Sequence, residues 1–144
     1  MIYADNAATT RISDSVLEKM LPFLCEQYGN ASSLYSVGIN AKRAIELARK
    51  QVAVAICAVP DEVIFTSGGS EANSWVLRSI AETHRNEPIH IITTAIEHHS
   101  VLNACRSLEQ TGIEVTYLPV NKMGRVSVDN LKAAIKPHTK LLKC

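Results

Sequence analysis

The sequence predicts an α/β fold, and two observations carry this prediction. Three apolar runs are rich in β-branched and aromatic side chains, as buried strands are. They occupy residues 62–66, 90–94 and 114–118. Each run is followed by a segment with helical character, and these segments occupy residues 70–85, 99–110 and 128–135. Strands that alternate with helices of this kind are typical of a sheet with parallel stretches.

The N-terminal part of the chain is predicted to form two helices joined by turns. Residues 2–4 are a short strand candidate that leads into a polar loop. A helix is expected to begin near Ser13, with Asp14 in its first turn, and Pro22 should kink or break it. A long helix then covers residues 37–56. Its predicted buried side consists of Ala41, Ala44, Ile45, Ala48, Val52 and Ala55.

The composition indicates which partners to exclude. The chain has 144 residues, the length of one ordinary domain, with 15 basic and 14 acidic side chains. This balance does not suggest nucleic acid or an anionic membrane as a partner. No apolar run approaches the roughly 18–20 residues of a membrane span, and no secretory signal is expected. Four scattered cysteines without a Cys-x-x-Cys pair indicate a reducing compartment, so we expect a cytoplasmic protein.

The turn after the first predicted strand has the pattern of a phosphate site. Gly68 and Gly69 permit a tight turn and a close approach to the backbone, and Ser70 follows where a helix N-cap belongs. Such a strand, turn and helix direct unpaired N–H groups and the positive end of the helix dipole toward one place. An ordinary turn with a capping serine explains these residues equally well.

Five segments, in order along the chain, favour the first interpretation. They read YADNAATTR at residues 3–11, YGNASS at 28–33, TSGGSE at 66–71, IITTAIEH at 91–98 and EVTYLP at 114–119. Together they resemble the cysteine desulfurases of the NifS/IscS type, which belong to the class V aminotransferase group of pyridoxal-phosphate (PLP) enzymes. The resemblance covers the whole chain to about residue 142, but only the N-terminal part of the family's longer chains.

The resemblance implies a fold-type-I architecture like that of aspartate aminotransferase, with a mixed, mostly parallel sheet and helices on both faces. Residues 1–15 would form an N-terminal segment, and residues 16–144 the first, incomplete part of the PLP-binding large domain. It also implies conversion of L-cysteine to L-alanine in a homodimer. The sulfur would pass, as an enzyme persulfide, to an acceptor or iron–sulfur scaffold protein for cluster or thio-cofactor synthesis. A selenocysteine lyase or another class V enzyme is the nearest alternative.

Three residues match the family's cofactor contacts. Gly69 and Ser70 match the phosphate site, and His98 matches the histidine that stacks on the PLP ring and assists proton transfer. Glu71 would be repelled by a phosphate, so we expect it to turn away and act structurally. Without the resemblance, His98 is more typical of a helix cap or a partly exposed histidine. Residues 97–99 are not expected to bind a metal, because adjacent side chains diverge around a helix start.

Two further residues match the family segment that lies near the substrate. These are Asn6 and Ala8, although a loop capped by its own Asx and Thr side chains explains them at least as well. The chain departs from the family at Ala31, where a proline is usual, and at Tyr35, where many members have histidine. The role of the loop around these two positions therefore stays open.

Several groups that desulfurase chemistry needs are not matched in this sequence. The family's Schiff-base lysine lies in a Ser-x-His-Lys motif, and none of the lysines here has that context. The nucleophilic loop cysteine and the aspartate for the pyridine nitrogen are also unmatched. Cys25 and Cys57 lie on apolar faces and are predicted to be core, Cys105 lies in a predicted helix, and Cys144 is terminal.

Because these groups are unmatched, we expect the chain alone to have no desulfurase activity. A fourth strand is expected at residues 139–142, and the sequence after it suggests a truncated or frame-shifted product. A sheet that stopped there would expose an edge. Two other hypotheses stay open, namely a non-catalytic α/β module that binds a phosphate ligand and a non-functional remnant that aggregates and binds nothing.

Overall fold

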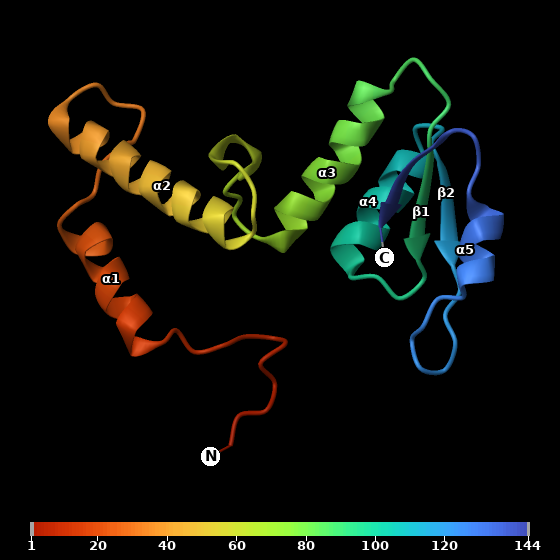
Figure 1. The fold of residues 1–144 in the computed structure, drawn as a ribbon, viewed down its shortest axis with the longest axis horizontal. Helices are drawn as coiled ribbons and strands as arrows, with labels where there is room; N and C mark the ends of the chain where they lie inside the picture. Colours follow the sequence, from red (N-terminus) through yellow and green to blue (C-terminus); the bar gives the residue numbers. More distant parts are fainter. Residues whose placement is uncertain (1, 144) are drawn as a thin grey trace. The chain divides into compact units, whose positions relative to one another are not determined.

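The computed structural model describes residues 2–143. The chain divides into two compact units (Figure 1), of which unit 1 spans Met1–Ile64 and unit 2 spans Phe65–Cys144. The division predicted between residues 15 and 16 stays a prediction, because the two units are defined by internal packing alone. None of the helices in the described part of the chain is both long enough and apolar enough to cross a bilayer.

Unit 1 contains two α-helices and a short 3₁₀ turn. Helix α1 spans Asp14–Cys25, α2 spans Ser36–Ala55 and the 3₁₀ turn η1 spans Pro60–Glu62. The acid Asp14 lies in the first turn of α1, where the helix dipole favours it. Helix α1 continues through Pro22, since a proline removes only its own N–H from the ladder. Of the two outcomes predicted at Pro22, the break is not formed, and the kink stays a prediction.

Unit 1 buries little of its apolar surface. Only Gly38 and Ala53 are buried in α2, whereas Ile45 and Val52 are 40% and 39% exposed. The prediction that Ile45, Val52 and Ala55 are buried was wrong, since all three are exposed. The physical reason is that, within the described part of unit 1, η1 is the element that packs closely on α2, and it covers only part of the apolar face.

Unit 2 is built on a three-stranded parallel sheet. Its strands are β1 (His90–Thr94), β2 (Glu114–Leu118) and β3 (Thr139–Lys143), in the order β2-β1-β3. Its helices are α3 (Gly69–Thr83), α4 (His99–Glu109) and α5 (Val128–Ala134). The strands predicted at residues 90–94, 114–118 and 139–142 are confirmed, with one more residue at the end of the last.

Helices cover both faces of this sheet. All five residues of the central strand β1 are buried, which requires cover on each side. The crossover through α4 leads from β1 to β2, and the crossover through α5 leads from β2 back past β1 to β3. Because such crossovers are right-handed, the two helices lie on opposite faces. Figure 1 shows α4 and α5 on opposite sides of the strands.

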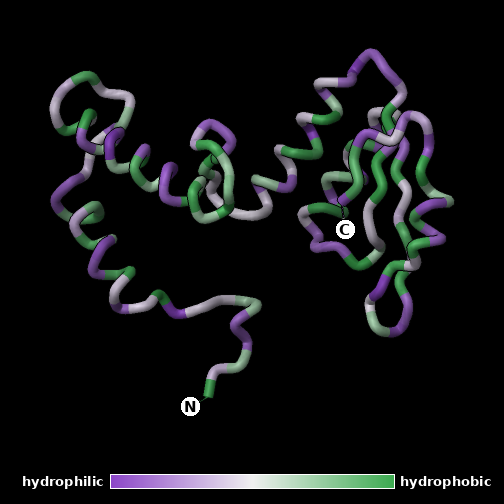
Figure 2. The backbone as a smooth tube through the Cα atoms, viewed as in Figure 1, coloured by the Kyte–Doolittle hydropathy of each residue, from purple (hydrophilic) through white to green (hydrophobic). Residues whose placement is uncertain are grey.

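The core of unit 2 is one apolar cluster between α3, α4 and the sheet. Its buried members are Leu77, Ile89, Ile91, Val101, Ala104, Cys105 and Leu108. Figure 2 shows hydrophobic and hydrophilic positions alternating along the helices, as one-sided packing requires. Full burial of each large apolar side chain stabilises the unit by about 1.5–3 kcal/mol. This cluster fixes α3 and α4 side by side on the sheet.

Two of the predicted strands are not formed. Residues 2–4 and 63–66 are irregular, and residue 62 ends the 3₁₀ turn. Val63 has extended backbone angles, φ −101° and ψ 119°, as the sequence predicted. A strand also needs a neighbour to accept and donate its backbone hydrogen bonds, and no strand among the described residues pairs with this segment. The local pattern predicted the extended conformation correctly and the pairing wrongly.

The start of α3 also differs from the prediction. Gly68 is the N-cap and Gly69 the first helical residue, so Ser70 lies inside the first turn instead of capping it. The backbone of Gly68 is extended, with φ 163° and ψ 177°. This shift places the N–H and the hydroxyl of Ser70 together at the N-terminal end of the helix.

Candidate functional site

The N-terminal end of α3 presents an open stretch of backbone. A Cβ atom added at Gly68 or at Gly69 would meet nothing within 4 Å. The first N–H groups of a helix have no intrahelical partner, and here they lie beside the exposed Ser70. Together with the positive end of the helix dipole, these groups favour an anion.

Glu71 does not occupy this open stretch. Its Oε2 accepts the backbone N–H of Ser67 at 2.6 Å, on the chain entering the helix. That hydrogen bond lowers the pKa of the carboxyl from its usual value of 4.5. The side chain therefore fixes the entry into α3, which agrees with the structural role expected from the sequence.

His98 lies at the start of α4, four residues after β1 ends. It is the N-cap of this helix, with φ −57° and ψ 145°, and its Nδ1 accepts the N–H of Ser100 at 3.1 Å. The capping interpretation of His98 is therefore confirmed. The ring is exposed. The cap uses the lone pair of Nδ1 in the plane of the ring, whereas stacking uses the face of the ring, so the capping does not exclude the cofactor role.

Two side chains tie His98 to the neighbouring helix. The hydroxyl of Ser100 lies 2.8 Å from Nδ1 of His98. The amide Nδ2 of Asn73, on α3, donates to the same hydroxyl at 3.0 Å. A chain of hydrogen bonds thus runs from α3 to the imidazole, and it crosses between the starts of two helices that pack on the same face of the sheet.

Ser70 and His98 line one surface hollow of about 430 Å³ between α3 and α4. Its lining consists of Ser70, Ser74, Arg78, His98, His99, Ser100, Asn103, Ala104 and Ser107. None of these side chains is acidic, and Arg78 adds a positive charge to the two helix N-termini. The hollow therefore attracts anions. Its end at Ser70 and His98 follows the carboxyl end of β1, which is where open α/β sheets bind their ligands, and the rest runs along the groove between the two helices.

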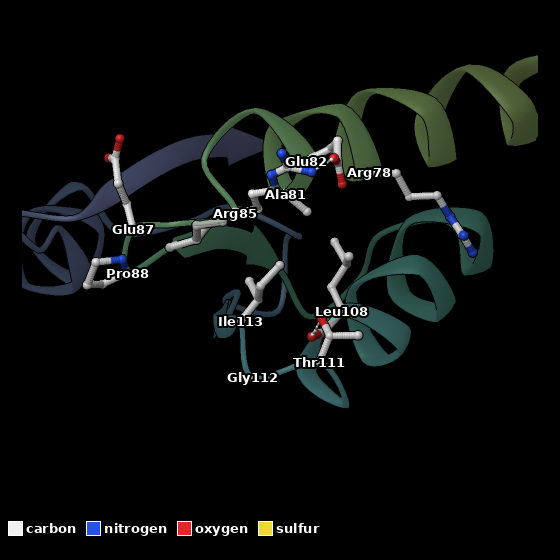
Figure 3. A pocket seen from close by; sticks show the side chains of 11 residues that line it. Arg78, Ala81, Glu82, Arg85, Glu87, Pro88, Leu108, Thr111, Gly112 and Ile113 are labelled. Atoms are coloured by element: carbon white, nitrogen blue, oxygen red, sulfur yellow. Dashed lines mark hydrogen bonds and ion pairs between the residues drawn. The ribbon is translucent and has the colours of Figure 1, made fainter.

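A second, larger hollow of about 530 Å³ lies at the other end of these elements (Figure 3). Pro88 and Ile89, which directly precede β1, line it together with the C-terminal part of α3. Its rim carries both charges, and Arg85 is paired with Glu82 at 3.0 Å. A site at the amino end of the strands lacks the helix N-termini that favour an anion, so the smaller hollow is the better candidate.

The sequence prediction missed several residues of the candidate site. These are Asn73, Ser74, Arg78, Ser100, Asn103 and Ser107. Their spacing carried a signal, because residues 70, 74 and 78 of α3 recur every four positions, and residues 100, 103 and 107 of α4 recur every three or four. Such spacing places polar side chains on one face of each helix.

Asn6 and Ala8, the predicted substrate contacts, belong to an exposed turn of unit 1. The hydroxyl of Thr10 donates to the carbonyl of Asn6 at 3.2 Å, and the N–H of Ala8 donates to the carbonyl of Asp5 at 3.1 Å. The self-capped loop that was the alternative interpretation is thus present in part. The role of Asn6 and Ala8 toward a substrate stays a prediction.

The cysteines are distributed differently from the prediction. Cys25 and Cys57 are exposed, so the prediction that they are core was wrong, because unit 1 leaves much of its apolar surface uncovered. Cys105 is fully buried, and burial raises the pKa of its thiol above the usual 9.0. Cys144, predicted to be merely terminal, lies outside the described residues.

An α/β chain with this sheet and these motifs falls in one known class. The chain belongs to the class V aminotransferase family, whose model, Aminotransferase class-V, matches residues 2–144. It is 50% identical over 141 residues to the cysteine desulfurase IscS of Methanosarcina thermophila. The aligned region covers 98% of this chain and 35% of that protein. It is 46% identical over 142 residues to the cysteine desulfurase of Homo sapiens, with 98% and 31% covered.

Solved structures agree with this assignment. A NifS-like protein superposes with a TM-score of 0.92 at 40% identity, over 96% of this chain and 38% of that one. SspA in complex with cysteine superposes with a TM-score of 0.90 at 38% identity, over 97% of this chain and 40% of that one. The predicted family and the fold-type-I architecture are therefore confirmed. The chain spans about a third of the length of the curated relatives it matches.

Proposed function

We propose that this chain is the N-terminal part of a PLP-dependent cysteine desulfurase that converts L-cysteine to L-alanine. The observation that carries the proposal is that Ser70 and His98, far apart in sequence, line one hollow without an acidic side chain. The identity with cysteine desulfurases along nearly the whole chain supports it. A selenocysteine lyase or another class V enzyme would use the same cofactor site. Residues outside this hollow would distinguish these enzymes from a cysteine desulfurase.

The residues of the hollow fit PLP on two counts. A phosphate suits the exposed backbone of Gly69 and Ser70, where a Cβ at the glycine would meet nothing, and the Ser70 hydroxyl can donate to it. An aromatic ring suits the exposed face of His98. When bound, PLP supplies a conjugated ring that withdraws electron density from the α-carbon of an amino acid held at its aldehyde.

The residues of this chain would then bind the phosphate of PLP and orient its ring. The backbone N–H groups and the hydroxyl at Ser70 would hold the phosphate, and Arg78 adds a positive charge to the hollow. The imidazole of His98 would stack on the ring and would hold a proton at Nε2, where a substrate group could exchange it. Glu71 holds the entry of α3 in place by accepting the backbone N–H of Ser67.

Dimerisation and sulfur transfer would be properties of the whole protein. We propose that it works as a cytoplasmic homodimer and passes sulfur, as an enzyme persulfide, to an acceptor or iron–sulfur scaffold protein. The Schiff-base lysine and the nucleophilic cysteine of the family have no match in these 144 residues. We therefore expect no turnover from the chain alone. Steady production of alanine and sulfide from cysteine and PLP, above a control without protein, would contradict this.

The phosphate site lies within this chain, so it can be tested without catalysis. Ser70→Glu places a carboxylate at the start of α3, where it favours the helix but repels a phosphate. We expect the dissociation constant for PLP, measured by fluorescence titration, to rise at least about tenfold. Ser79→Glu adds the same charge to an exposed position of the same helix and should have little effect.

Two further titrations complete this test. Pyridoxal, which lacks the phosphate, should bind Ser70→Glu and the unchanged chain equally weakly. His98→Ala should weaken PLP about threefold to tenfold, the range expected when one stacked ring is lost. Equal PLP affinity in Ser70→Glu and Ser79→Glu would remove the phosphate role of this helix start. Equal affinity of all the variants for PLP would overturn the proposed site.

The same hollow supports a second candidate for the chain by itself. A non-catalytic module that binds a phosphate ligand needs only the N-termini of α3 and α4 and the polar lining between them, all of which lie in unit 2. A nucleotide that competes with PLP, with similar affinity and the same loss in Ser70→Glu, would favour this candidate.

A further inference from the structure

We propose that Asn73 and Ser100 are positioning residues that hold the imidazole of His98 in one tautomer and one orientation, with its proton on Nε2. The inference rests on the proposed function for its catalytic meaning. It rests on the hydrogen bonds of unit 2 for its geometry. Neither residue has to touch the cofactor for this role.

The first step concerns the protonation of the ring. A backbone N–H can only donate, and the N–H of Ser100 lies 3.1 Å from Nδ1 of His98. Nδ1 must therefore present its lone pair, and in the neutral ring the proton is on Nε2. The hydroxyl of Ser100, 2.8 Å from the same nitrogen, then also donates to it. Two donors thus converge on one edge of the imidazole.

The second step concerns the direction of the Ser100 hydroxyl. A serine hydroxyl rotates to suit its partners, and it can donate only one hydrogen. The Nδ2 group of Asn73 donates to its oxygen at 3.0 Å. The hydrogen of the hydroxyl is then directed at Nδ1 of His98. All three groups are ordered in one direction, from the Asn73 amide through the hydroxyl to the imidazole.

A helix cap does not require this arrangement. The cap of α4 needs only the lone pair of Nδ1 and the backbone N–H of residue 100, which any residue except proline would supply. The hydroxyl of Ser100 and the amide of Asn73 are both partly buried and add a side-chain bond between α3 and α4. This bond restrains rotation of the ring. It leaves the Nε2–H edge directed away from the cap, as an orienting partner does for a catalytic histidine.

The test is nitrogen NMR of the chain labelled with ¹⁵N, without cofactor, at about pH 8.5, where an ordinary histidine is neutral. Long-range proton–nitrogen spectra distinguish an Nδ1–H ring from an Nε2–H ring, and the His98→Gln variant identifies the signals of His98. We expect Nε2–H to be the major form. Ser100→Ala should lower the ratio of Nε2–H to Nδ1–H about fivefold, which is the effect of losing one neutral hydrogen bond.

Variants of Asn73 test the direction of the hydrogen bonds. In Asn73→Asp the carboxylate only accepts, so it draws the hydrogen of the Ser100 hydroxyl away from the imidazole. We expect a larger Nδ1–H population than in Asn73→Leu, which removes the bond without reversing it. Asn103→Leu is the matched control, because Asn103 lines the same hollow but accepts from Arg106. Ser107→Ala is the control for Ser100→Ala.

Rescue and stability measurements separate positioning from folding. Ser100→Thr keeps the hydroxyl and should restore the ratio of the two tautomers. A purely structural role would lower the melting temperature and leave the ratio unchanged. A major Nδ1–H form in the unchanged chain, or an equal ratio in Ser100→Ala and Ser107→Ala, would overturn the proposal. If PLP fails to bind while the ratios change as expected, the proposed function fails and the positioning stands.

Discussion

Nδ1 of the His90 imidazole lies 2.8 Å from the hydroxyl oxygen of Thr139. Its other nitrogen, Nε2, lies 2.8 Å from the hydroxyl of Thr116. One buried ring on the central strand β1 thus bonds to both neighbouring strands, and the residue is fully inaccessible to solvent. A neutral imidazole can donate at one nitrogen and accept at the other, which suits two hydroxyl partners. This is a polar link across the whole sheet of unit 2.

The link makes stability depend on pH. Burial lowers the pKa of His90 below its usual 6.5; Glu114 opposes the shift, and Lys136 and His138 add to it. Because the folded pKa is lower, the unfolded chain takes up the proton first as pH falls. The free energy of unfolding should therefore decrease below about pH 6.5, by at most about 1.4 kcal/mol per pH unit for one proton. Urea unfolding between about pH 8 and pH 5.5 measures it.

His90→Gln provides the control, because glutamine keeps a donor and an acceptor but does not titrate. Its unfolding free energy should vary less with pH over the same range. The carboxyl of Glu114 does not interfere, since Lys136 and His138 lower its pKa to about 2. Its contribution is lost only as pH falls from the usual 4.5 toward that value. An unchanged pH dependence in His90→Gln would show that other groups control it.

The core of unit 2 predicts a matched pair of substitutions on α3. Leu77 is 2% exposed and packs with Ile91 and Val101, whereas Val76, next to it in sequence, is 53% exposed. Leu77→Ala should destabilise the unit by about 2–5 kcal/mol, and Val76→Ala by far less. Chemical denaturation followed by circular dichroism compares them. A similar loss in both variants would mean that α3 does not pack on the sheet as described.

Strands β1 and β2 could be predicted because they are rich in β-branched and aromatic side chains, and β3 because an apolar pair follows a third predicted helix. His98 was predicted from its motif and Ser70 from the turn that precedes α3, and the structure places both at one hollow. Asn73 and Ser100 were missed because they are 27 residues apart in sequence and only the packing of α3 on α4 brings them together. The strand at residues 62–66 failed for the same reason, since strand pairing is set by distant residues.

The buried thiol of Cys105 predicts a difference in reactivity. The thiolate is the reactive form, and Cys105 is fully buried with its pKa raised by burial. Cys25 and Cys57 are exposed. In a Cys144→Ser background, a thiol reagent such as DTNB should label two cysteines rapidly and the third only after unfolding. Three equally rapid thiols would contradict the packing of α4 on the sheet, and digestion with mass spectrometry would identify each one.

The end of α2 carries a strained residue whose replacement should stabilise unit 1. Cys57 has a positive φ of 56°, and the N–H of Ala58 bonds to the carbonyl of Ala53 at 2.8 Å, which is the pattern that normally has glycine at this position. The left-handed conformation costs a residue with a side chain about 1–2 kcal/mol, and glycine would remove this cost. Glycine also makes the unfolded chain more flexible, which favours unfolding by roughly 0.5–1 kcal/mol. Cys57→Gly should therefore raise the unfolding free energy by about 0.5–1 kcal/mol. Cys57→Ala keeps the Cβ and the strain, so it should not share this gain. Amide hydrogen exchange at the end of α2 measures both variants, and equal protection in them would mean that the backbone there is unstrained.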